Sequence, residues 1–89
     1  MDTILVAPDG ATTLLWTHES NREPFRLEIL AAYRPASGTF GRTFQVTPRS
    51  VKESHFIDAA VTASGNVALA YRDQERNRSY FVPATWPRP

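Results

Sequence analysis

Two stretches decide how this 89-residue chain folds, VAPDGATTLLW at residues 6–16 and VTASGNVALAY at residues 61–71. They are related by a shift of 55 residues, which superposes three identical residues: Val6 on Val61, Gly10 on Gly65 and Leu14 on Leu69. In each stretch a glycine lies in a short polar turn, and an alternating run that ends in an aromatic residue follows it. Glycine tolerates a positive φ angle, and alternation with a period of two is typical of strands. Each stretch therefore predicts a strand, a tight turn and a second strand.

The same reasoning extends over the rest of the chain. Clusters of Gly, Pro, Asn, Asp and Ser recur at short intervals and separate runs in which bulky and small or polar residues alternate. This pattern predicts an all-β fold with seven strands, at about residues 3–7, 11–17, 25–33, 43–47, 56–62, 67–72 and 79–86.

The shift of 55 continues beyond the two stretches. It places Trp16 on Tyr71 and Phe25 on Tyr80, so that bulky residues fall on bulky residues. A unit of this length that contains several strands is typical of a β-propeller blade. The sequence thus divides into a first repeat at about residues 3–57 and an incomplete second repeat at about 58–89, within one domain at residues 1–89.

Several short segments also carry a resemblance to a known group of proteins. The segments VAPDG at 6–10, RLE at 26–28 and RPASGTFG at 34–41 resemble one repeat of bacterial tandem-repeat β-propeller-like proteins with sialidase-like, Asp-box-like blades. The segments AVTASGN at 60–66 and WPRP at 86–89 are similar to parts of the next repeat. The turn departs from an Asp box, because Ala7 stands where that motif has a hydroxyl residue. The resemblance implies four-stranded antiparallel blades with aromatic and branched residues packed between them.

About one and a half such blades cannot close a propeller ring. Unpaired strand edges and bare sheet faces promote association, and symmetric assembly is a common remedy. We therefore expect homo-oligomerisation to complete the blades. A fragment of a longer protein and a compact pair of sheets without propeller geometry are the other two interpretations.

Two segments also have helical features, so an α+β fold with a helix near residues 50–63 is the alternative. Ser50 and Glu53 have the spacing of a capping box, and Gly65 could end the helix. Residues 23–34 contain many good helix formers after Pro24. Local propensity leaves both segments undecided between strand and helix.

Composition and charge exclude several classes of function. Hydrophobic residues make up 42% and charged residues 21% of the chain, as in ordinary globular proteins, and the formal net charge is only +1. Arginines lie near aromatics in the C-terminal third, but acidic residues interrupt them, so nucleic acid is not an expected partner. There is no cysteine, which excludes disulfides and thiolate chemistry. No apolar run is long enough for a membrane helix, so no membrane partner is expected, and the compartment stays open.

The candidate ligand site lies at the ends of the second strands of the two repeats. Trp16 and Tyr71 are expected either to fill gaps between blades or to line a pocket in which a sugar ring stacks. In the second interpretation, Arg22, Arg72 and Asn77 supply hydrogen bonds.

No catalytic, cofactor or metal-binding residues are expected. His18 and His55 are separated by 37 residues and lack a recognised motif, and the acidic residues lie in polar loops. The sequence favours a non-enzymatic scaffold or binding module that self-associates and recognises protein or glycan. The alternatives are a fragment of a glycosidase-like propeller enzyme and a small nucleic-acid-binding or regulatory protein.

Overall fold

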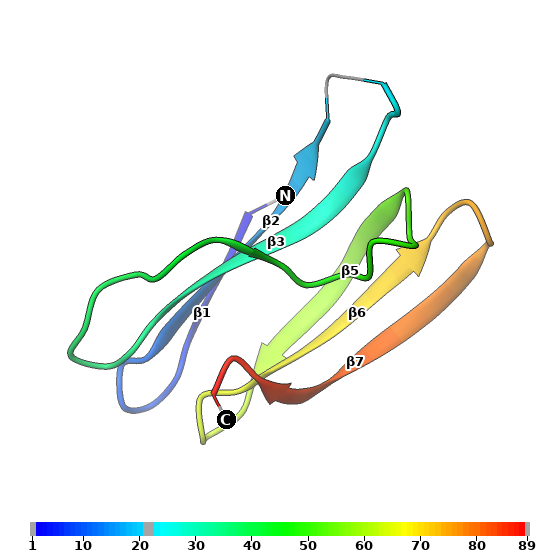
Figure 1. The fold of residues 1–89 in the computed structure, drawn as a ribbon. Helices are drawn as coiled ribbons and strands as arrows, with labels where there is room; N and C mark the ends of the chain where they lie inside the picture. The colour runs from blue at the N-terminus through cyan, green and yellow to red at the C-terminus, as the bar shows by residue number, and fades with distance from the viewer. Residues whose placement is uncertain (1, 21–22, 89) are drawn as a thin grey trace.

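A computed structural model describes residues 2–20 and 23–88, which form two antiparallel sheets (Figure 1). The first sheet has the order β1-β2-β3-β4 and the second has the order β5-β6-β7, so each is a simple meander. The strands are β1 (Asp2–Val6), β2 (Thr12–Glu19), β3 (Leu27–Arg34), β4 (Phe44–Gln45), β5 (Ser54–Val61), β6 (Val67–Asp73) and β7 (Arg78–Trp86).

The all-β fold class is confirmed, and each of the seven strands starts and ends within two residues of its predicted bounds. The alternative helix near 50–63 is wrong, since the described residues contain no helix. Backbone groups that a helix would need are bonded to other segments: the Lys52 carbonyl accepts a hydrogen bond from Leu27 N and the Glu53 carbonyl accepts one from Gln74 N. The Glu53 carboxylate contacts His55 at 2.8 Å rather than taking part in a capping box.

The two glycine turns have the same geometry. Gly10 and Gly65 have φ angles of 95° and 91°. Each donates its N–H to the carbonyl three residues earlier, Ala7 or Thr62, at 2.9 Å. The strand pairing that follows is also equivalent, because Val6 lies opposite Thr12 as Val61 lies opposite Val67.

This equivalence does not extend to the third strands. The shift of 55 would make Tyr80 the counterpart of Phe25, but Tyr80 pairs with Tyr71 as Leu30 pairs with Trp16. The pairing therefore replaces the shift of 55 by one of 50 in this part of the chain. Three of these five residues are due to loop length, since residues 20–26 connect β2 to β3 and only residues 74–77 connect β6 to β7. The other two are due to one additional residue pair at the loop end of the β2–β3 ladder.

The two sheets lie against each other, with their strands running along roughly the same line (Figure 1). The core between them consists of Leu15, Ile29 and Ala31 from the first sheet, Val67, Leu69 and Tyr71 from the second, and Val51 from the connecting segment. Phe44 of β4 and Trp86 of β7 make an edge-to-face contact between the two sheets, with ring centroids 6.2 Å apart.

Arg88 links the Gly10 turn to the Gly65 turn through hydrogen bonds. Its Nη2 donates to the Asp9 carboxylate at 2.9 Å and its Nη1 donates to the Ser64 carbonyl at 2.6 Å. The Arg88 backbone N–H donates to Asn66 Oδ1 at 2.8 Å. A hydrogen bond from the Ala11 backbone and the Arg88 guanidinium lower the pKa of Asp9, so this ion pair stays charged at neutral pH.

Candidate functional site

The face of the first sheet that points away from the core has apolar side chains in its central rows, and Asp2, Thr12, His18, Glu28 and Arg34 around them. Directly paired residues of an antiparallel sheet share a face, and β2 residues alternate between the core face of Leu15 and the opposite face of Leu14 and Trp16. We call this opposite face the first outer face; its apolar residues are Ile4, Val6, Leu14, Trp16, Leu30 and Ala32.

The first outer face is open to solvent along β1, whereas Ala32 on β3 is buried, and the face contains a cavity. Ile4 is 67% exposed and Val6 is 56% exposed, whereas Leu14 and Trp16 are half-buried. The cavity has a volume of about 330 Å³ and is lined by Asp2, Thr3, Ile4, Leu14, Leu15 and Trp16. This depression has an aromatic side chain and a single carboxylate.

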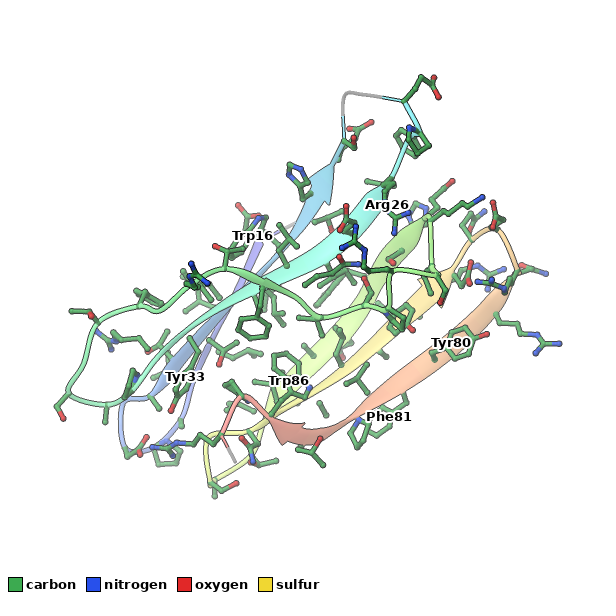
Figure 2. All side chains as sticks on the ribbon, viewed as in Figure 1. Trp16, Arg26, Tyr33, Tyr80, Phe81 and Trp86 are labelled. Carbon is green, nitrogen blue, oxygen red and sulfur yellow. The ribbon has the colours of Figure 1, made fainter. Side chains whose placement is uncertain are left out.

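The face of the second sheet that points away from the core has a different character. We call it the second outer face; it contains Asp58, Ala60, Ala68, Ala70 and Phe81, and towards the β6–β7 turn the polar residues His55, Arg72 and Ser79. Phe81 is 68% exposed and stands beside a cavity of about 200 Å³ whose lining is rich in alanine. Trp16 and Phe81 lie on opposite sides of the molecule (Figure 2). The chain thus exposes a large-residue face on one side and a small-residue face with one phenylalanine on the other.

The structure separates the residues of the expected ligand pocket. Trp16 belongs to the first outer face, whereas Tyr71 is buried in the core and stacks on Tyr80 with ring centroids 5.6 Å apart. Burial raises the pKa of Tyr71, with further contributions from Tyr80 and Asp73, and keeps its phenol neutral. Trp16 and Tyr71 therefore do not line a common pocket.

The remaining expected residues lie near the β6–β7 turn or outside the described part. Arg72 shares the solvent-facing side of β6, and its Nε donates to Gln74 Oε1 at 3.2 Å. Asn77 is exposed in the turn with a positive φ of 57°. Arg22 lies outside the described residues.

Sequence reasoning missed Ile4 and Phe81, the two most exposed large apolar side chains of the described residues. A signal for Ile4 was present in the sequence. If the predicted strands pair closely around the turn at Gly10, Ile4 lies opposite Leu14 and on the same face of the sheet. For Phe81, alternation in the predicted strand at residues 79–86 indicated only that it lies on the face opposite to Tyr80 and Val82, and not which of the two faces is covered.

A buried acidic residue, Asp73, lies at the C-terminal end of β6, next to the β6–β7 turn. The Asp73 side chain has no exposed surface; its Oδ2 accepts a hydrogen bond from Arg76 Nη1 at 2.7 Å and its Oδ1 accepts one from the Arg76 backbone at 3.2 Å. The side-chain hydrogen bond from Arg76 is the main cause of a lowered pKa of Asp73. This pair closes the β6–β7 turn.

We expect Asp73 to make the stability of the protein depend on pH. Its pKa is lower in the folded than in the unfolded state, so its stabilising contribution is present above about pH 4, the ordinary pKa of aspartate, and disappears as the pH falls through the folded value. In urea titrations at pH 7, 5 and 3, Asp73→Asn should be less stable than the wild type at pH 7 and should lose less stability on acidification. On unfolding at acidic pH, the Asp73→Asn variant should take up as much as one proton fewer than the wild type.

Asp9→Asn is the matched comparison, because Asp9 also has a lowered pKa but pairs with Arg88 at the opposite end of the molecule. The two substitutions should therefore reduce the pH dependence additively. An unchanged pH profile in Asp73→Asn would contradict the role of the Asp73–Arg76 pair.

The described residues show no assembled metal centre. They contain no group of three His, Cys, Asp or Glu side chains that could hold a metal ion. The two cavities have one carboxylate each, Asp2 and Asp58. Among residues 2–20 and 23–88 there is also no helix long and apolar enough to cross a membrane.

Comparisons with other proteins add no functional assignment. No family model, curated protein or solved structure matches this chain. A function must therefore be inferred from the two outer faces themselves.

Proposed function

We propose that this protein is a non-enzymatic scaffold of two β-propeller-like blades, which self-associates and docks protein partners through its outer sheet faces. The observation that carries this proposal is the presence of apolar side chains on both faces that the core leaves uncovered, with Ile4 and Phe81 each about two-thirds exposed. Large contiguous apolar patches on a protein surface usually mark interaction sites.

The arrangement of the strands supports the blade interpretation. Both sheets are antiparallel meanders in sequence order, as a propeller blade is, and they pack face to face. The first sheet has four strands, of which β4 has only two residues, and the second has three. Association with further copies would cover the sheet faces that the described residues leave open.

The free energies of side-chain burial and of association indicate that several apolar side chains must be buried together for a partner to bind. Complete burial of one large aliphatic or aromatic side chain contributes about 1.5–3 kcal/mol. Association costs about 4–15 kcal/mol in lost translational and rotational freedom. Several side chains must therefore be buried together, and the first outer face provides Ile4, Val6, Leu14 and Trp16 in adjacent positions of two paired strands.

Other ligands have less support. A glycan would need hydrogen-bonding groups around an aromatic platform, and the cavity beside Trp16 has Asp2 and Thr3 as its polar residues. A glycosidase would need two carboxylates flanking one bond, and neither cavity described above brings two together.

The test is the molar mass in solution, measured by light scattering after size-exclusion chromatography from micromolar to millimolar protein. We expect the mass to rise above that of one chain as the concentration increases. Because the faces are apolar, association should persist in 1 M sodium sulfate, whereas binding driven by charge would weaken. A single-chain mass at every concentration would refute self-association.

A further inference from the structure

The packing of the two sheets inside the chain brings two unlike faces together. The first sheet contributes the face that contains Thr13 and Leu15 on β2. The second sheet contributes the face that contains Leu69 and Tyr71 on β6. The contact is thus between odd-numbered residues of both strands.

The equivalence of the two hairpins shows which surfaces correspond. Under the shift of 55, which the pairing of β1 with β2 and of β5 with β6 obeys next to the turns, Leu69 and Tyr71 correspond to Leu14 and Trp16. An odd shift exchanges the odd and even positions of a strand. The buried face of the second sheet is therefore the counterpart of the first outer face.

The reverse correspondence also holds. Ala68 and Ala70 on the second outer face correspond to Thr13 and Leu15 on the buried face of the first sheet. The molecule therefore packs one face of each kind at its centre and exposes one face of each kind at its two ends. A second copy could therefore pack on the first in the way the two sheets pack inside the chain. The first outer face of one copy would then contact the second outer face of the other.

The side chains of the two exposed faces fit this correspondence. Leu14 is identical to the buried Leu69, and Trp16 is an aromatic residue in the place of Tyr71. On the opposite kind of face, the paired residues Leu15 and Ala31 are buried, and their counterparts by strand pairing are Ala70 and Phe81. Each pair contains one large and one small residue. In the first sheet the large residue, Leu15, lies on the middle strand β2, whereas in the second sheet the large residue, Phe81, lies on the third strand β7.

We propose that a second copy of this chain docks head to tail, with the first outer face of one copy against the second outer face of the next. This proposal rests on the proposed self-association and specifies its partner and its geometry. The contact repeats the packing inside the chain, with Leu14 and Trp16 of one copy against Ala70 and Phe81 of another. Such an interface joins two different surfaces, so successive copies form either a closed ring or an open filament.

The test uses two single substitutions that each block one face. Ile4→Glu places a charge on the first outer face and Phe81→Glu places one on the second. Both positions are about two-thirds exposed in the single chain, so neither substitution removes a core contact. Each variant alone should stay at the mass of one chain at a concentration where the wild type associates, because burial of an unpaired carboxylate is unfavourable.

A mixture of the two variants gives the decisive result. Each variant keeps the face that the other has lost, so an equimolar mixture should form a complex with twice the mass of one chain and no larger species. Phe25→Glu is the matched control, because Phe25 is an exposed phenylalanine in the β2–β3 connection, outside both faces, and this variant should associate like the wild type. Circular dichroism of every variant should show the same strand signal as the wild type.

The other outcomes separate the two proposals. Association of Phe81→Glu alone would indicate a symmetric contact between two first outer faces, and association of Ile4→Glu alone would indicate one between two second outer faces. Either result, or a mixture without complexes, would overturn the head-to-tail geometry while the wild type still associates. A wild type that remains a single chain would overturn the proposed self-association itself.

Discussion

Replacement of Leu69 by alanine should reduce the free energy of unfolding by about 2–5 kcal/mol. Leu69 has no exposed surface and lies in the middle of the core, where both neighbouring strands pack beside it. Its truncation removes apolar contacts and leaves a cavity in a core that only two small sheets enclose. Because small domains are stable by about 5–15 kcal/mol, this single change should remove a large part of the total. Chemical denaturation followed by tryptophan fluorescence measures it.

Leu14→Ala is the matched control, since Leu14 has the position in the first hairpin that Leu69 has in the second. Leu14 keeps more exposed surface than Leu69 in the single chain, so its truncation should cost less, about 1–2 kcal/mol, at concentrations where the protein is a single chain. Equal losses for the two variants would contradict the assignment of buried and exposed faces. At higher concentrations, Leu14→Ala should also weaken self-association.

Replacement of Gly65 by alanine should destabilise the protein by about 1–3 kcal/mol. A φ angle of 91° is unfavourable for any residue with a Cβ atom, and an alanine Cβ would lie 2.7 Å from Arg88 Nη1. The Arg88 side chain would have to move, which would disturb its contacts with Ser64 and Asp9. Thermal or urea unfolding of the variant measures the loss.

Two other glycines provide controls for the Gly65 substitution. Gly10 has almost the same φ but no neighbour closer than 3.9 Å to an added Cβ, so Gly10→Ala should cost about 1–2 kcal/mol from backbone strain alone. Gly41 has neither a positive φ nor a close neighbour, and Gly41→Ala should change stability by about 0.5 kcal/mol or less. In an Arg88→Ala background, Gly65→Ala and Gly10→Ala should become equivalent.

The strands and the tight turns were predictable because they depend on neighbouring residues. A glycine between two alternating runs permits a positive φ, and the runs on either side then pair without further information, as they do around Gly10 and Gly65. The helix near 50–63 was an alternative because the capping signal at Ser50 is also local. It is overruled by hydrogen bonds from Leu27 and Gln74, which are distant in sequence.

The candidate site was only partly predictable. Trp16 does lie in a cavity, but Tyr71, its counterpart in the sequence, lies inside the core. Repetition places the two residues at equivalent positions of their hairpins. It does not indicate which side of each hairpin receives the neighbouring sheet.

By itself, the sequence favoured an all-β fold, placed seven strands within two residues of their observed bounds and indicated that two glycine turns are alike, but it left a helix near residues 50–63 open. Only the tertiary structure decided which side of each sheet is covered. Leu14 and Leu15 are adjacent and equally hydrophobic, so alternation makes both sides of β2 apolar and cannot rank them. The ranking arises when the second sheet packs on the side of Leu15, because one sheet can cover only one side of another, and the second sheet therefore leaves the side of Leu14 and Trp16 uncovered.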